Sequence, residues 1–180
     1  MLISVTDLKK YYPKFVEFED DVLERKLGVI ENAIRNYTHN KFYNTLVKFK
    51  GSIVDGVIQT SSPYLKVGDT IEISEGLNKG LYTISEITEN TIKVDGTTYD
   101  TYNNLIIKVE YPIDVIEGAI GLLNWELIEK GKEKTGIASE SISRHNVSYV
   151  QRTGDNTIKG YPVELFNFCA DYMVMRTWKK

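Results

Sequence analysis

One cluster of side chains in this chain has the residue types of a hydrolytic site. It consists of Ser139, Ser141, Ser143, Arg144 and His145. A serine nucleophile needs a histidine base, a third group that orients the imidazole and an oxyanion hole. The chain has no G-x-S-x-G turn that would expose such a serine, so we do not expect an enzyme. A hydrolase that uses Ser141 or Ser143 with His145 is the alternative, and a His145→Ala substitution would test it.

The sequence does not indicate a metal or cofactor site either. The chain contains two histidines, His39 and His145, and one cysteine, Cys169, without the paired spacing of zinc ligands. The glycine-containing loops at 76–80 and 96–104 do not fit a phosphate-binding motif. Cys169 lies within an apolar pattern, so we expect a buried and inert thiol. No cofactor is therefore expected.

Length and composition are those of an ordinary folded protein. The chain has 180 residues, of which 42% are hydrophobic and 26% are charged, and its formal net charge is −3. This length suffices for one domain or two small ones. No apolar run approaches the roughly 18 residues that a membrane span needs, and the N-terminus lacks a signal-peptide pattern. We expect a protein made in a reducing cytoplasm, without membrane contact.

Residues 1–44 and 111–180 show the period of amphipathic helices. Apolar residues recur three or four positions apart from Val22 to Tyr37, and a similar stripe runs through 113–128. Because a helix cannot bury such a stripe alone, the two stripes are expected to pack against each other. These two parts of the chain are therefore predicted to form one helical bundle.

Three further residues bear on the second helical part. Gly118 and Gly121 lie within the apolar stripe, where glycine is less favourable than alanine by up to about 1 kcal/mol. We interpret them as positions where another backbone approaches closely. Pro162 suits the first position of a helix, so a broadly apolar final helix is expected from there.

Residues 45–110 have the alternating period of β-strands. Short segments rich in Val, Ile and Thr are separated by turn residues, among them Gly68-Asp69, Glu89-Asn90 and Asp95-Gly96. Five or six antiparallel strands of this length close best as a small SH3-like barrel. The predicted fold class is α+β, a helical bundle into which a barrel of residues 45–110 is inserted.

The charge of the predicted barrel bears on its partners. Residues 45–110 contain six lysines and nine acidic residues, a net charge of −3. Tight binding to phosphate groups needs the opposite sign. A nucleic-acid-binding regulator that uses the barrel is therefore kept only as the alternative function, to be tested by salt-dependent binding to duplex DNA and RNA.

Residues 136–161 separate the last two helical patterns. Apolar residues such as Ile142 and Val147 alternate there with polar ones, as in a strand that lies on a surface, and Gly154-Asp155-Asn156 is a turn signal. Main-chain pairing is a known way for such a segment to bind a neighbouring subunit. We predict an extended assembly arm over these residues.

Several stretches resemble one known protein family. The segment "DLKKYYP…LERKLGVIENAIRNYTHNKF" and the later "SESISRHNVSY…GYPVELFNFCADYMVMR" look like head-tail connector (adaptor) proteins of tailed bacteriophages of Gram-positive hosts. The resemblance covers residues 1–43 and 111–180. The barrel segment "GLYTISEITENTIKVDG" is similar to a β insertion that some of these connectors carry. None of these motifs carries a catalytic group, so the match is one of pattern and order.

The resemblance implies a structural protein of the virion, assembled in the host cytoplasm. It implies a homo-oligomeric ring, commonly of twelve copies, beneath the portal protein at the head-tail interface. Such a ring extends the channel through which genomic DNA passes without specific binding, and it docks the tail or stopper protein. The candidate contacts with sister subunits or the portal are Ser141, Ile142, Arg144, His145, Val147, Tyr149, Arg152, Trp178 and Lys179.

Overall fold

The computed structural model divides the chain into two compact units. The described residues are 1–130, 139–142, 145–148 and 156–175. The first unit, here the barrel unit, contains Met1–Asp20 and Lys41–Pro112, and the second unit contains Asp21–Asn40 and Ile113–Lys180. Residues 1–20 therefore group with the barrel, whereas the sequence analysis places them with the helices.

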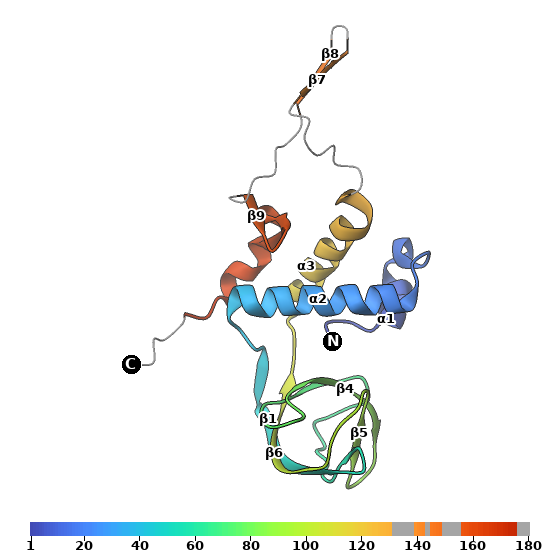
Figure 1. Cartoon of the computed structure of the whole chain (residues 1–180), viewed down its shortest axis with the longest axis vertical. Helices are drawn as coiled ribbons and strands as arrows, with labels where there is room; N and C mark the ends of the chain where they lie inside the picture. The colour runs from blue at the N-terminus through green and yellow to red at the C-terminus, as the bar shows by residue number, and fades with distance from the viewer. Residues whose placement is uncertain (131–138, 143–144, 149–155, 176–180) are drawn as a thin grey trace. The chain divides into compact units, whose positions relative to one another are not determined.

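The barrel unit contains a closed antiparallel barrel of six strands (Figure 1). The strands are β1 (Tyr43–Val54), β2 (Val57–Ile58), β3 (Thr70–Ile73), β4 (Gly80–Ile87), β5 (Ile92–Val94) and β6 (Thr101–Val109). Their order is β1-β2-β5-β4-β3-β6, and β6 pairs with β1 to close the barrel. This part of the fold agrees with the sequence prediction and is compatible with an SH3-like barrel.

Isoleucine and valine fill the barrel. The side chains that are at most 1% exposed in this core are Ile53, Ile58, Ile71, Ile73, Ile84, Ile92 and Ile106. Each contributes about 1.5–3 kcal/mol relative to an exposed position. Gly51 must stay small, because a Cβ there would lie 2.8 Å from a Thr60 methyl carbon and 3.0 Å from one of Ile58. The alternating pattern of the sequence thus produces one dry core.

Tight turns join neighbouring strands. Asp55 and Gly56, between β1 and β2, both have positive φ, 51° and 78°, as a type I′ turn requires. The turn between β4 and β5 is held by Thr88 and Thr91, whose hydroxyl oxygens are 2.6 Å apart, around Glu89-Asn90. The positive φ values of Asp55 and Gly56 match the right-handed twist of the strands. The two turns hold hairpins in which Ile53 lies opposite Ile58 and Ile87 opposite Ile92.

The N-terminal segment of the barrel unit forms two short helices, α1 (Val5–Tyr11) and η1 (Pro13–Phe15). The side chain of Ser4 caps α1 by accepting a hydrogen bond from the Asp7 N–H at 3.0 Å. The Met1 ammonium group donates to the Thr70 hydroxyl at 2.5 Å. Through this contact the start of the chain is attached to β3.

The second unit is built from short elements around one long helix. They are α2 (Asp20–Thr38), α3 (Ile113–Asn124), the π-helix η2 (Trp125–Glu129), β7 (Ser139–Ile142), β8 (His145–Ser148), β9 (Thr157–Ile158), β10 (Tyr161–Pro162) and the 3-10 helix η5 (Val163–Tyr172). On α2, Leu23, Leu27 and Ile34 are fully buried. The stripe expected on this helix is therefore present.

The prediction of a helical bundle is wrong, because the structure is a closed six-stranded antiparallel barrel with helices. The α-helix α3 ends at Asn124, where a π-turn begins. Pro162 belongs to strand β10, with ψ of 134°, and does not start an α-helix. The residues after it form a 3-10 helix, whose rise of about 2.0 Å per residue changes which side chains share a face.

The three-residue period of η5 explains which of its side chains are buried. Phe166 and Cys169, three positions apart, are the buried residues of this helix. Phe166 packs edge-on against Tyr37 of α2, with ring centroids 5.1 Å apart. Tyr172, three positions further, donates its hydroxyl to the Asp114 carboxylate at 2.8 Å. A narrow stripe therefore replaces the broad apolar face that an α-helix would have presented.

Gly118 and Gly121 of α3 have different environments. A Cβ at Gly118 would overlap the aromatic ring of Phe168, whereas a Cβ at Gly121 would meet no atom within 4 Å. Close approach thus occurs at Gly118, and the approaching group is a side chain of η5 and not a backbone. Gly121 has no such neighbour.

We expect opposite effects when alanine replaces these two glycines. Gly118→Ala should lower the free energy of unfolding by about 1–2 kcal/mol, since overpacking outweighs the gain in helix propensity. Gly121→Ala, the matched control, should raise it by up to about 1 kcal/mol. Urea denaturation of both variants measures the difference. Equal stability of the two variants would contradict the contact between Gly118 and Phe168.

Candidate interaction surfaces

The structure places part of the predicted assembly arm in a hairpin. Strands β7 and β8 pair antiparallel, with Ser141 opposite Asn146 and Ile142 opposite His145. The backbone register therefore does not pair a serine with the histidine. The turn signal of the sequence, Gly154-Asp155-Asn156, lies almost entirely outside the described residues.

Four of the nine residues predicted to contact sister subunits or the portal protein lie in the described part of the chain. Ser141, Ile142, His145 and Val147 lie in the strands of the hairpin. The others lie outside the described residues: Arg144, Tyr149, Arg152, Trp178 and Lys179. The structure brings together the first four through main-chain pairing.

The barrel carries a surface cavity of about 480 Å³ at one end. Its lining residues are Asn44, Leu46, Val47, Tyr64, Lys108 and Glu110. A bulge in β1 creates it, because Tyr43 pairs with Val109 but the next pair joins Lys48 to Ile107. The Leu46 side chain is 91% exposed on this bulge. The polar groups of the cavity already have partners: Asn44 donates to Glu110 at 2.8 Å, and Lys108 pairs with Asp69 at 2.9 Å.

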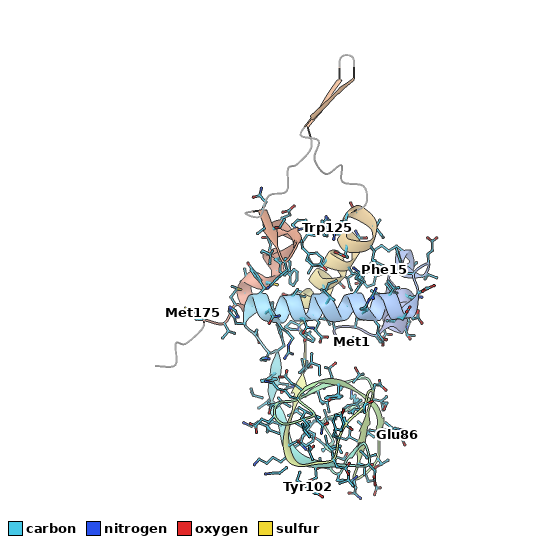
Figure 2. All side chains as sticks on the ribbon, in the orientation of Figure 1. Met1, Phe15, Glu86, Tyr102, Trp125 and Met175 are labelled. Atoms are coloured by element: carbon cyan, nitrogen blue, oxygen red, sulfur yellow. The ribbon has the colours of Figure 1, made fainter. Side chains whose placement is uncertain are left out.

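A second exposed apolar surface lies on the loops that precede β4 and β6 and on the first residues of β6. We call it the tyrosine end, defined by Leu77 and Tyr99 of the loops and Tyr102 of β6. Tyr102 is 82% exposed and stands away from the barrel wall (Figure 2). Exposed apolar side chains that lie close together are typical of interaction sites.

A buried asparagine holds these loops together. Asn78 is 1% exposed, and its amide nitrogen donates to the Tyr99 carbonyl and to the Thr101 hydroxyl, both at 2.7 Å. Its amide oxygen accepts from the Tyr99 N–H at 2.7 Å. Asn104, 6% exposed, donates to the same Thr101 hydroxyl at 2.9 Å and to the Gly51 carbonyl at 3.2 Å. The tyrosine end is therefore a preformed surface.

The tyrosine end is surrounded by negative charge. Four exposed acidic residues lie on its two loops and on the β1–β2 turn: Asp55, Glu75, Asp95 and Asp100. The N–H of Asp55 donates to the Asp100 carboxylate at 2.9 Å, which links the β1–β2 turn to the β6 loop. None of these carboxylates forms an ion pair with a described residue. Lys79 is the one basic residue on these loops, so the acidic residues outnumber it.

A charged group in the second unit has a structural role. Glu126 of η2 accepts a hydrogen bond from Lys26 of α2 at 2.7 Å and pairs with Lys130 at 3.4 Å. Burial would raise the pKa of Glu126, but the hydrogen bond from Lys26 and the charge of Lys130 outweigh it and lower the pKa. Burial first, and then the charge and hydrogen bond of Glu126, raise the pKa of Tyr161 to about 12. This cluster connects α2, η2 and β10.

The described residues also include one cysteine and several acidic side chains of the types that carry chemistry. Cys169 is buried, and burial raises the pKa of its thiol to about 12, as expected for an inert thiol. Within the described ranges, no three His, Cys, Asp or Glu side chains are grouped so as to hold a metal ion. None of the helices in those ranges is long and apolar enough to cross a membrane.

No family model matches the chain, and no curated protein matches it.

The tyrosine end was not predicted from the sequence, where the segments around Leu77 and Tyr99 were interpreted as ordinary hairpin loops. The available signal was the presence of Tyr99 and Tyr102, only three positions apart, in a segment that otherwise contains glycine and polar residues. That Asn78 would be buried and would join two loops could not be inferred, because it depends on the pairing of β3, β4 and β6.

The loops of the tyrosine end allow a matched test of their hydrogen bonds. The hydroxyl of Thr98 is buried without a partner, the one such side-chain atom among the described residues. The hydroxyl of Thr101 instead accepts from Asn78 and Asn104 and donates to the Tyr99 carbonyl. Thr101→Val should lower the free energy of unfolding by about 1–3 kcal/mol, since Asn78 and Asn104 lose a partner. Thr98→Val should leave it unchanged or raise it by up to about 1 kcal/mol. Thermal denaturation of both variants measures these changes. An equal loss of stability in the two variants would contradict the hydrogen-bond network around Thr101.

The shifted tyrosine gives a pH-dependent prediction. The pKa of Tyr161 in the folded protein, about 12, exceeds the usual value of 10.0. The neutral phenol therefore contributes fully to the free energy of unfolding below about pH 10, and this contribution is lost as the pH rises towards 12. In Tyr161→Phe, the decrease of the free energy of unfolding between these pH values should be smaller by roughly 1 kcal/mol. Tyr64→Phe, at an exposed tyrosine, is the control and should behave as the wild type. Urea denaturation at several alkaline pH values measures the slopes, and a Tyr161→Phe slope equal to that of the wild type would contradict the shift.

Proposed function

We propose that this chain is a non-enzymatic assembly protein, a head-tail connector (adaptor) of a tailed bacteriophage. In this proposal, copies of the chain form a ring beneath the portal protein, and the ring docks the tail or stopper protein. Genomic DNA passes through the channel of the ring without specific binding. The proposal starts from the resemblance of the chain to such connectors in residues 1–43 and 111–180.

The observation that carries the proposal is the hairpin of β7 and β8. It lies within the part of the sequence where the resemblance is strongest, and it forms a two-stranded sheet of its own, in which each strand has four residues. An isolated two-stranded hairpin is marginally stable in water, and a third strand or a packed face stabilises it. A neighbouring subunit that adds a strand to either edge supplies this stabilisation.

The barrel also supports an interaction role. Its exposed apolar residues gather at two places, the cavity beside Leu46 and the tyrosine end. Neither place groups a nucleophile with a base, and both offer the apolar area that protein partners bury. The net charge of −3 on residues 45–110 suits a surface near DNA that does not retain it.

Association with the portal protein tests the proposed function directly. The chain is mixed with the portal protein of the same phage, and native mass spectrometry and electron microscopy are used to detect a ring of chains on the portal. Absence of any complex would refute the proposal. A gel shift with duplex DNA that weakens steeply with salt would instead favour a nucleic-acid-binding regulator.

The role of the hairpin is tested by one substitution and its control. Val147→Asp places a charge on the hairpin and should weaken ring formation at least about tenfold, as for a residue central to an interface. Val67→Asp, the same change at an exposed residue of the barrel, should leave it unchanged. Equal ring formation by both variants would show that the hairpin makes no subunit contact.

A further inference from the structure

The tyrosine end has the properties of a docking surface for a positively charged, aromatic segment. Leu77, Tyr99 and Tyr102 supply apolar area and two ring faces, and the network around Asn78 fixes the loops that carry them. A rigid surface loses little conformational entropy when it binds. What binds here must bring apolar groups to cover these three side chains.

The surrounding charges define the occupant further. Four exposed carboxylates lie on the loops of the tyrosine end and on the adjacent turns, at Asp55, Glu75, Asp95 and Asp100, and none forms an ion pair with a described residue. Lysine and arginine are attracted both to such carboxylates and to tyrosine ring faces. Nucleic acid carries the same sign of charge as this surface and is disfavoured.

One segment of this chain has the matching chemistry. Residues 176–180, Arg-Thr-Trp-Lys-Lys, bring three cationic side chains and one tryptophan within five positions. The described chain leads directly to them: the Val174 N–H donates to the Thr38 carbonyl at 2.8 Å, and Met175 is 90% exposed (Figure 2). Residues 130–134 are also rich in lysine but have no aromatic residue. Residues 9–15 combine lysines with aromatic residues, but they are folded into α1 and η1, where Lys9 pairs with Asp20 and Phe15 is buried.

We propose that the tyrosine end of one copy binds residues 176–180 of a second copy. Trp178 covers the apolar side chains, and the cationic residues on either side of it pair with the carboxylates and ring faces. Because the two surfaces differ, the contact is heterologous and can repeat from copy to copy until a ring closes. The inference rests on the proposed function in that it assigns one of the contacts between subunits of the ring.

Binding of a labelled peptide to the full-length chain tests the contact. The peptide has the sequence of residues 173–180, and fluorescence anisotropy is measured at chain concentrations where the protein is monomeric. Saturable binding is expected, and it should weaken with added salt. A peptide with Trp178→Ser should bind at least about tenfold more weakly, as is typical for the loss of an aromatic anchor.

Variants of the full-length chain locate the site. Combined Tyr99→Ser and Tyr102→Ser should weaken peptide binding at least about tenfold. Combined Glu75→Gln and Asp95→Asn should weaken it about threefold and reduce its salt dependence. Combined Glu86→Gln and Glu89→Gln removes the same charge at the other end of β4, and binding should not change. Because all six residues are exposed, circular dichroism should confirm that every variant is folded.

Three outcomes would overturn the inference. The first is absence of saturable binding up to about 1 mM peptide, which is weaker than a specific contact requires. The second is equal binding by the wild type and the tyrosine variant. The third is weaker peptide binding by the wild-type chain than by a Trp178→Ser chain, because the chain's own segment would then occupy the site.

The peptide-binding experiment and the portal experiment test different claims. A chain that joins the portal but does not bind the peptide disproves only this contact. A chain that binds the peptide but never joins the portal disproves only the proposed function.

Discussion

The pairing of β1 with β6 is the constraint on which the rest of this structure depends. It joins segments that are far apart in the sequence, since it places Tyr43 opposite Val109 and Ile53 opposite Thr101. Directly beside this pair, the Glu110 N–H donates to the Phe42 carbonyl at 2.9 Å, and the rings of Phe42 and Tyr111 lie 4.9 Å apart. The chain therefore enters and leaves the barrel at one place. Because of this, residues 21–40 and 113–180 can form one compact unit although the barrel separates them in sequence.

Each unit has a different kind of core, and this difference affects where binding surfaces form. Isoleucine and valine predominate in the barrel core, with Phe49 and Tyr82 packed against it, whereas Tyr99 and Tyr102 are exposed at the loop before β6 and at its start. The second unit instead buries its aromatic residues: Trp125 packs against Tyr161 at 5.5 Å, and Phe166 packs against Tyr37 at 5.1 Å. These rings add to the aliphatic residues that α2 and α3 bury, among them Leu27, Ile34 and Leu123. Exposed aromatic side chains on the barrel therefore mark a candidate binding surface, whereas the aromatic residues named in the second unit serve its core.

The sequence predicted the barrel well and the helical part poorly, for physical reasons. Alternation of apolar and polar residues has a period of two, and only an extended strand satisfies it, so the barrel and its closure followed from the pattern. Asp55-Gly56 was an equally clear turn signal that the pattern analysis did not use. After Pro162, by contrast, apolar residues are so dense that they fit both a 3.6-residue and a three-residue period. Only the contacts of Phe166, Phe168 and Cys169 select the 3-10 helix, and such contacts depend on the tertiary structure.

Net charge is a poor guide to what the barrel can bind, because its charges are not evenly distributed. Lys48 and Lys50 are exposed two positions apart on β1, and alternation places them on the same side of that strand. Acidic residues instead gather on the loops and turns around Tyr99 and Tyr102. A total of −3 therefore conceals a positively charged strand and a negatively charged, aromatic end. In the proposed contact between copies, the loops and the start of β6 select the partner, and the hydrogen bonds of Asn78 and Asn104 hold that surface in place.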